Sequence, residues 1–341
     1  MSDRAAPRAV IYGCAGPTLS AAEEAFFRDA DPLGFILFAR NCESPDQVRG
    51  LVAALRASVG RADAPVLIDQ EGGRVARLKP PQWRAVPPPS FFGRLATHDR
   101  DRAAEALGLN TRLLAMELCD LGIDVDCVPV LDLQFPGASD VIGDRSFGGD
   151  PALVGDLGRI VCDTMLAEGV MPVVKHIPGH GRARVDSHKE LPVVGTGLPE
   201  LSATDFQPFE ALAQAPWGMT AHVVYTALDG ERPATTSAKV ISEVIRGQIG
   251  FQGLLLSDDL SMEALKGGLD ARASKALEAG CDIALHCNGK PEEMEAIARI
   301  APAMTAAAQD RFAAGRQRLG RPEAADRELL QRRLDVLTSV G

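Results

Sequence analysis

The chain has 341 residues, of which 46% are apolar and 24% charged, and its formal net charge at pH 7 is −10. A chain of this length buries a core large enough to be stable without a disulfide or a structural metal. The acidic balance and the lack of any block of lysine or arginine argue against nucleic acid or an anionic membrane surface as a partner.

Eight short apolar segments predict buried strands. They are rich in β-branched residues and apolar nearly throughout, as expected for strands that are covered on both faces of a parallel sheet. In chain order they are residues 9–16, 34–40, 64–73, 123–133, 170–179, 218–225, 253–260 and 281–287.

Amphipathic patterns between these segments predict helices over residues 44–60, 101–122, 150–170 and 237–250. The alternation predicts an α/β fold of one domain, a (β/α)8 TIM-type barrel over about residues 8–300. We expect residues 301–341 to form two further helices on the barrel exterior. The alternative is a doubly wound open sheet, but no GxGxxG motif follows the first segment.

The cysteines and the apolar runs indicate the cellular compartment in which the protein is expected. The seven cysteines are odd in number, form no CxxC motif and lie mostly in apolar stretches, so we expect reduced, buried thiols. No run approaches the roughly 18 apolar residues of a membrane span, and the first residues lack the apolar core of a signal peptide. We therefore expect a soluble, cytoplasmic monomer that binds neither a membrane nor nucleic acid.

Polar residues cluster where the predicted strands end. Because the carboxyl ends of barrel strands open onto one face, these side chains converge on one pocket. We expect one of Lys175 and His176 to point into the barrel mouth. Adjacent strand residues face opposite sides, so at most one of Asp258 and Asp259 reaches the pocket. The other candidates are Asp69, Glu71, His222, His286 and Asn288.

The segment KHIPGHGRARVDSH, residues 175–188, has three interpretations. A metal site is disfavoured because Pro178 and two glycines break any helical spacing of its histidines, and neither Cys nor Glu joins them. A solvated polar loop is the second interpretation. The third is a proton-transfer pair, in which Asp186 orients the imidazole of His188 and raises its basicity. The possible metal ligands are His176, His180, Asp186 and His188.

Five motifs together resemble the β-N-acetylhexosaminidases of glycoside hydrolase family 3, in particular its single-domain bacterial members. They are DQEGGRVARL (69–78), GDRSFGGDP (143–151), KHIPGHG…DSH (175–188), MTAHVVY (219–225) and SDDLSM (257–262). The resemblance implies a retaining exo-glycosidase that releases terminal, non-reducing N-acetylglucosamine without a metal or an organic cofactor. It also implies a small-molecule glycan substrate, a cytoplasmic anhydro-muropeptide of peptidoglycan recycling.

The same resemblance implies roles for individual residues. Asp258 is the expected nucleophile and His188 the acid/base, supported by Asp186. We expect Gly179 and Gly181 to let the loop that carries His188 move. The scarcity of aromatic residues favours a small pocket for one sugar. The residues expected to bind sugar hydroxyls are Asp69, Arg77, Arg145, Lys175 and His176.

Two alternatives stay open. A phosphorylase would use the same Asp258–His188 pair with phosphate in place of water. A non-catalytic sugar-binding module is disfavoured because Asp258, Asp186 and His188 are all present.

Overall fold

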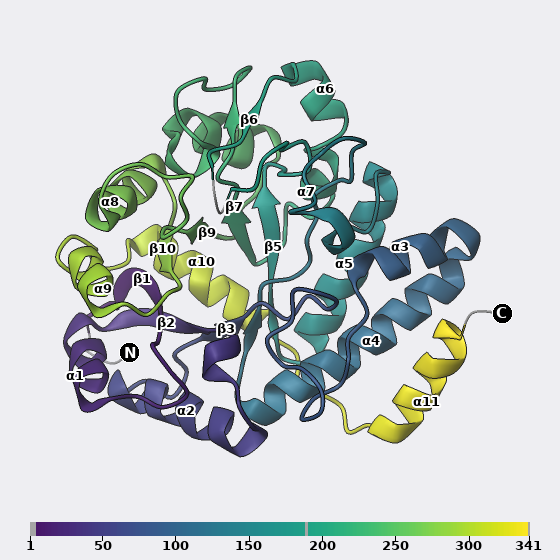
Figure 1. Cartoon of the computed structure of the whole chain (residues 1–341), viewed down its shortest axis with the longest axis horizontal. Coiled ribbons are helices and arrows are strands. Elements are labelled where there is room, and N and C mark those ends of the chain that lie inside the picture. The colour runs from purple at the N-terminus through teal and green to yellow at the C-terminus, as the bar shows by residue number, and fades with distance from the viewer. Residues whose placement is uncertain (1–4, 188–189, 340–341) are drawn as a thin grey trace.

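The computed structural model describes residues 5–187 and 190–339 and shows a ring of parallel strands surrounded by helices (Figure 1). Within these ranges eight strands close a barrel in the order β1-β10-β9-β7-β5-β4-β3-β2. The closed barrel confirms the predicted (β/α)8 fold and excludes the open sheet. Its strands are β1 (Arg8–Gly13), β2 (Pro32–Leu37), β3 (Val66–Ile68), β4 (Val125–Asp126), β5 (Met171–Ile177), β7 (Trp217–Thr220), β9 (Leu254–Asp259) and β10 (Ile283–His286).

Each predicted strand segment overlaps a barrel strand, but the one at 218–225 was too long. The segment 218–225 leaves the barrel at Thr220, and its last residues form β8 (Val224–Tyr225). This strand pairs in parallel with β6 (Val193–Val194) in a separate two-stranded sheet. His222 therefore lies between two strands, and not inside one.

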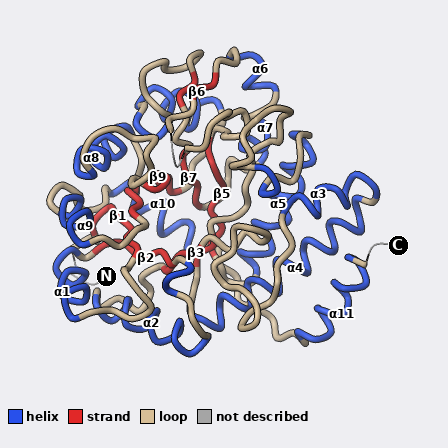
Figure 2. Tube along the Cα trace, in the orientation of Figure 1, coloured by secondary structure: helices blue, strands red, loops and turns tan. Residues whose placement is uncertain are grey.

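Most of the helices lie around the ring of strands, and α10 lies behind the ring in the view of Figure 2. Helix α2 begins as predicted, with the Ser44 side chain capping the amide of Gln47 and proline in the first turn. The predicted helix 237–250 is mainly a π-helix, η4 (Val240–Gln248). The α-helices are α1 (Ala21–Ala30), α2 (Pro45–Ser58), α3 (Pro89–His98), α4 (Arg100–Leu121), α5 (Pro151–Ala167), α6 (Leu198–Ala203), α7 (Gln207–Ala211), α8 (Leu269–Ala279), α9 (Pro291–Ala298), α10 (Ala306–Gln317) and α11 (Arg327–Thr338).

Three short 3₁₀-helices complete the elements: η1 (Ala39–Asn41), η2 (Gly143–Arg145) and η3 (Ala234–Thr236). In the part of the chain that the structure describes, no helix combines the length and the apolar character needed to cross a membrane. All seven cysteines are free thiols, and five of them are buried.

The strands separate two apolar layers. Along β1, Ile11 faces the barrel interior, whereas Val10 and Tyr12 pack toward the helices. This alternation follows from the two-residue period of a strand. Strand pairing between β1 and β10, with Ile11 opposite Leu285, closes the ring.

The two C-terminal helices have different places. Helix α11 packs on α4 on the exterior, as predicted, and its Arg333 pairs with Glu105. Helix α10 instead covers the amino-terminal end of the barrel, where Phe312 packs against Trp217 with their ring centroids 5.8 Å apart. The prediction of two exterior helices is therefore wrong for α10, which contributes to the inner apolar layer.

A buried carboxylate connects several elements at the amino-terminal end of the barrel. Asp282, just before β10, accepts the amide of Leu255 at 2.9 Å. Its carboxylate also pairs with Arg246 at 2.9 Å and with Arg311 at 2.7 Å. One buried carboxylate thus joins β9 to η4 and to α10.

We predict that Asp282→Asn lowers the free energy of unfolding by about 2–3 kcal/mol, because it removes charge-assisted bonds to two guanidinium groups. Urea denaturation measures the change. The residue is remote from the opposite end of the barrel, so activity per folded molecule stays at the wild-type level. A stability change below about 0.5 kcal/mol would show that the two arginines contribute nothing here.

Candidate active site

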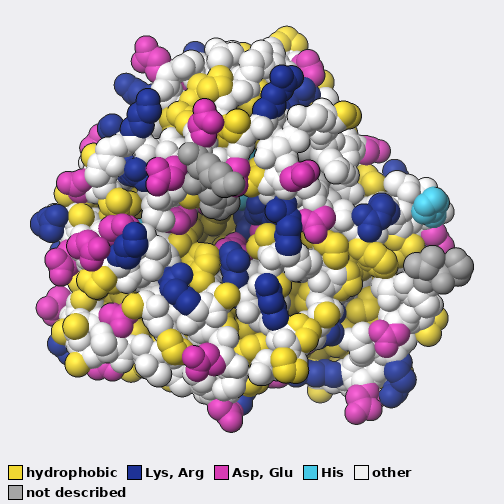
Figure 3. Space-filling view, viewed as in Figure 1, with side chains coloured by type: hydrophobic (Ala, Val, Ile, Leu, Met, Phe, Trp, Pro, Cys, Tyr) yellow, Lys and Arg dark blue, Asp and Glu magenta, His cyan; other side chains and the backbone are white. Residues whose placement is uncertain are grey.

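A cavity of about 210 Å³ opens at the carboxyl ends of the barrel strands. Figure 3 shows it as a hollow at the centre of this face, with basic and acidic side chains at its edge. Part of its wall is apolar, from Ile36, Met219 and Leu285. Its polar lining residues are Asp69, Glu71, Arg77, Arg145, Lys175, His176, His180, Ser187, Asp258 and Asp259.

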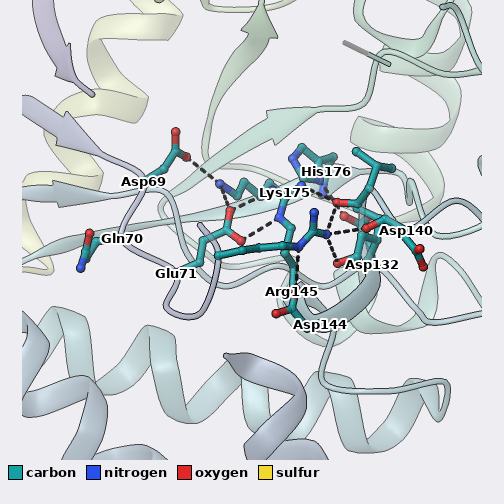
Figure 4. A network of polar contacts seen from close by, with 12 residues as sticks. Asp69, Gln70, Glu71, Asp132, Asp140, Asp144, Arg145, Lys175 and His176 are labelled. Atoms are coloured by element: carbon teal, nitrogen blue, oxygen red, sulfur yellow. Dashed lines mark hydrogen bonds and ion pairs between the residues drawn. The ribbon is translucent and has the colours of Figure 1, made fainter. Parts of the chain in front are cut away.

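Lys175, on β5, is a buried charge in this lining, with 2% of its side chain exposed. Its ammonium lies 2.8 Å from Asp69 Oδ1 and 2.6 Å from Glu71 Oε1 (Figure 4). Burial alone lowers the pKa of a lysine, but the two carboxylates outweigh it and raise the pKa of Lys175 above its ordinary value. The ammonium is therefore fully charged at neutral pH.

Glu71 binds a second cation. Arg145, from η2, donates Nε and Nη2 to the two oxygens of Glu71, each at 2.8 Å. Such a bidentate pair fixes the plane of the guanidinium. Burial opposes ionisation of Glu71, but Arg145 and Lys175 prevail and lower its pKa to about 2.

A third cation, Arg77, is held from three sides. Its Nη2 donates to Asp69 Oδ2 at 3.1 Å, and its guanidinium carbon lies 4.8 Å from the centre of the Phe38 ring. The amides of Arg77 and Leu78 both donate to the side-chain oxygen of Gln70. Gln70 thereby folds the loop after β3 back on itself and places Arg77 at the cavity.

A buried carboxyl supports this loop from below. Asp126, on β4, accepts the amide of Gln70 at 3.0 Å through Oδ1. Its Oδ2 is buried and has no hydrogen-bond partner among the described residues. Burial raises the pKa of Asp126 to about 7, and the negative charges of Asp69 and Glu71 contribute to the rise.

His176 is oriented by another buried carboxylate, Asp132. Its Nδ1 lies 2.6 Å from Asp132 Oδ2, and Asp132 Oδ1 accepts the amide of His180 at 2.6 Å. Burial would raise the pKa of Asp132, but the two histidines and the amide lower it. Burial lowers the pKa of His180 to about 4, so that ring is neutral at pH 7.

Asp258 lies at the end of β9 and lines the cavity. Its Oδ1 accepts the amide of Asp259 at 2.8 Å. No hydrogen bond to Oδ2 exists within the described ranges, which leaves this oxygen available to a ligand. Burial opposes ionisation, but His222, His176 and the Asp259 amide hold the pKa of Asp258 below its ordinary value. A carboxylate with an available oxygen can act as a nucleophile.

His222 is held on both ring nitrogens. Nε2 lies 3.0 Å from the carbonyl oxygen of Asp259, and Nδ1 lies 2.7 Å from Thr235 Oγ1. A carbonyl only accepts, so Nε2 carries the proton and Nδ1 accepts from the hydroxyl. Burial lowers the pKa of His222, consistent with this neutral form.

Both aspartates of the SDD motif line the cavity, contrary to the expectation that at most one reaches it. Their environments differ. Asp259 accepts the amides of Ser261 and Cys287 through Oδ1 and the Ser261 hydroxyl through Oδ2. Both oxygens of the Asp259 carboxylate thus accept hydrogen bonds in the turn after β9, whereas Oδ2 of Asp258 accepts none from a described residue.

Three residues of the segment 175–187 besides Lys175 line the cavity: His176, His180 and Ser187. Lys175 and His176 both line it, although we expected only one to do so. A side chain at Gly181 would meet the carbonyl oxygen of Leu133 at 2.0 Å, so close packing requires glycine at this position. His180 Nε2 lies 3.1 Å from Ser187 Oγ, which brings residue 187 to the cavity wall.

Asp186 is half-buried and does not line the cavity in the described part of the chain. The predicted acid/base His188 lies outside the described residues. Within the described ranges, no three His, Cys, Asp or Glu residues are grouped so that they could hold a metal ion.

The structure therefore brings together six of the eight predicted site residues: Asp69, Arg77, Arg145, Lys175, His176 and Asp258. Glu71 and His222 were noted as polar residues near strand ends but given no role. Asp132 was missed because it lies inside a predicted strand, where only the charge among apolar neighbours could have signalled it.

Comparisons of this sequence with known proteins agree on one family. Residues 18–321 match the family described as "Glycosyl hydrolase family 3 N terminal domain". A "Beta-hexosaminidase" of Alkalilimnicola ehrlichii is 42% identical over 299 residues, which cover 86% of this chain and 84% of that protein. Another, of Aromatoleum aromaticum, is 38% identical over 324 residues and covers 93% of this chain and 88% of its own.

A solved structure extends the similarity to the fold. The structure of NagZ from Neisseria gonorrhoeae in complex with N-trifluoroacetyl-D-glucosamine has a TM-score of 0.88 and 31% sequence identity to this chain. The match covers 99% of this chain and 100% of that one.

We predict that Glu71→Gln destabilises the protein by about 3 kcal/mol at pH 7, because the lowered pKa of Glu71 corresponds to that stabilisation. The folded pKa lies below the ordinary value of 4.5, so the contribution is present above that pH and is lost as pH falls toward 2. Urea denaturation between pH 7 and pH 3 should show the gap between variant and wild type narrowing.

Glu117→Gln is the matched control. Glu117 pairs with Arg84 at 3.5 Å, away from the cavity, and burial raises its pKa. A raised pKa costs stability as pH rises, so the stability of this variant relative to wild type should improve with increasing pH. Parallel pH trends for the two variants would contradict the account of Glu71.

Proposed function

The chain belongs to glycosyl hydrolase family 3, and on that premise we propose that it is a retaining exo-β-N-acetylglucosaminidase. The observation that carries the proposal is the ionised Asp258 with an available oxygen, in a cavity that it shares with the paired charges of Asp69, Glu71, Arg77, Arg145 and Lys175. The proposed substrate is an anhydro-muropeptide of peptidoglycan recycling, processed in the cytoplasm. The names of the similar proteins support the hexosaminidase class.

In the proposed first step, Asp258 Oδ2 attacks the anomeric carbon of the bound sugar and the bond to the aglycone breaks. A covalent glycosyl-enzyme results. Water cleaves this ester in the second step and restores the carboxylate. The lowered pKa of Asp258 keeps it ionised and ready to attack at neutral pH.

We assign the proton transfers to His188. It protonates the departing oxygen in the first step and accepts a proton from water in the second. Its sequence neighbour Ser187 lies at the cavity wall with Asp258, which supports the assignment. Asp186, two residues earlier, is the proposed partner that orients the imidazole.

The remaining polar residues are proposed to bind the hydroxyl groups of one sugar: Asp69, Arg77, Arg145, Lys175 and His176. Each charged group among them already has a partner that fixes its position, so binding requires little rearrangement. The cavity volume of about 210 Å³ suits a single sugar and leaves the aglycone outside.

Product analysis distinguishes the proposal from its nearest alternative. Incubation with an anhydro-muropeptide and, separately, with chitobiose should release free N-acetylglucosamine at a rate that does not depend on phosphate. Release of a sugar phosphate that requires added phosphate would instead identify a phosphorylase.

We predict that Asp258→Ala lowers kcat by roughly 10⁴-fold or more, because the covalent route is lost. The variant should still fold, as judged by its thermal transition. Asp259→Asn keeps a polar group in the turn after β9 and should keep most of the turnover. A reversed order of effects would assign the nucleophile to Asp259.

We predict that His188→Ala discriminates between leaving groups. A sugar alkoxide needs a proton as it departs, whereas nitrophenolate does not, so the natural substrate should lose roughly 10²–10⁴-fold more rate than a nitrophenyl glycoside. On the nitrophenyl substrate the second step becomes limiting, and stopped-flow absorbance should show a burst of nitrophenolate. Equal losses on both substrates without a burst would exclude His188 as the acid/base.

A further inference from the structure

A second, larger depression lies beside the sugar cavity. It encloses about 640 Å³ and is bordered by the loop before η3, the loop after β9 and helix α8. We call it the cationic groove, defined by Arg232, Lys266, Arg272 and Lys275. The function proposed above does not use it.

One thin wall separates the groove from the sugar cavity. Ser187 and Met262 line the cavity, whereas Leu191 and Ala264 line the groove. The amide of Ala264 donates to the carbonyl of Ser187 at 3.3 Å, which joins the two segments of this wall. The groove is therefore adjacent to this side of the cavity.

The groove is positively charged, although the whole chain carries −10. Its four cations are accompanied by two carboxylates, Glu231 and Glu278, and Glu278 accepts the Ser274 hydroxyl. Figure 3 shows Lys and Arg side chains gathered near α8, to the upper left of the central hollow.

The cations have different roles. Arg272 donates to the carbonyl oxygens of Leu260, Met262 and Gly267 and so holds the loop after β9. The side chains of Arg232, Lys266 and Lys275 form no ion pair or hydrogen bond with any described residue. Three cations therefore remain available to an anionic ligand, and Arg272 holds the loop after β9 beside them.

We propose that the cationic groove binds carboxylate groups on the aglycone of the substrate; this rests on the function proposed above. The sugar cavity has room for one sugar, so the part of the substrate beyond the scissile bond must lie outside it. Ser187 lies on the side of the cavity that adjoins the groove, so an aglycone that extends from the cavity on this side reaches the four cations. Lysine ammonium groups attract carboxylates as point charges and impose little geometry, which suits a flexible peptide.

The test compares three substrates that share the same sugar. One is an N-acetylglucosaminyl anhydro-muramic acid that carries a peptide with free carboxylates. The second carries the same peptide with its carboxylates amidated, and the third has no peptide and its lactyl carboxyl group amidated, so that its aglycone has no carboxylate. The double variant Lys266→Glu/Lys275→Glu should lose roughly 10-fold in kcat/KM on the first substrate, because attraction becomes repulsion. On the other two substrates its kcat/KM should change by less than about twofold.

Two controls accompany the test. Arg299→Glu reverses an exposed charge at the end of α9, away from the groove, and should leave all three substrates at the wild-type rate. Raising salt from about 0.05 to 0.5 M should slow wild-type cleavage of the carboxylate substrate alone, because salt screens exposed charges.

Equal losses of the double variant on all three substrates, or no loss on any, would overturn the groove assignment while leaving the glycosidase intact. A loss shared by the free and amidated peptides would show a contact with the peptide that does not involve its carboxylates, and would also overturn it. Failure of the wild type to cleave any of the three would instead remove the proposed function, and this inference with it.

Discussion

The buried ammonium of Lys175 is the constraint on which the site depends. An ammonium removed from water is costly unless opposite charges compensate it at close range. Asp69 and Glu71 supply them, at 2.8 and 2.6 Å. Each carboxylate then holds a further cation, Arg77 or Arg145, so five charged groups from the loop after β3, from η2 and from β5 share one arrangement. Loss of Asp69 would remove the carboxylate that pairs with Arg77, and loss of Glu71 would remove the one that pairs with Arg145.

A deeper pair of carboxyl groups supports this arrangement, and their surroundings shift their pKa values in opposite directions. Asp132 has an imidazole and backbone amides around it, and they lower its pKa. Asp126 has one amide and two negatively charged neighbours, and its pKa rises to about 7. Two aspartates six positions apart thus differ because one is surrounded by donors and the other by carboxylates.

The fold was largely predictable because eight buried strands alternating with helices have few other solutions. That the barrel strand ends at Thr220 could not be predicted. The sequence "TAHVVY" is apolar enough to continue the strand, and only the pairing of β8 with β6 removes its last residues from the barrel. Convergence of Asp69, Lys175 and Asp258 follows from the barrel geometry, whereas their roles came from resemblance. The directions of individual side chains could not be predicted from the sequence. Strand alternation fails for Asp258 and Asp259, because β9 ends there and a turn begins.

The closure of the barrel also bears on how the chain folds as it is made. Strand β1 has β10 as a neighbour, and the inner layer at the amino-terminal end is completed only by α10. One edge of β1 can pair with β2 as soon as that strand has been made, but its other edge waits for β10, more than 260 residues later. Closing so long a loop is entropically slow, and the open barrel exposes apolar edges in the meantime. Until β10 and α10 have been synthesised, the partly formed barrel is therefore in its most aggregation-prone state.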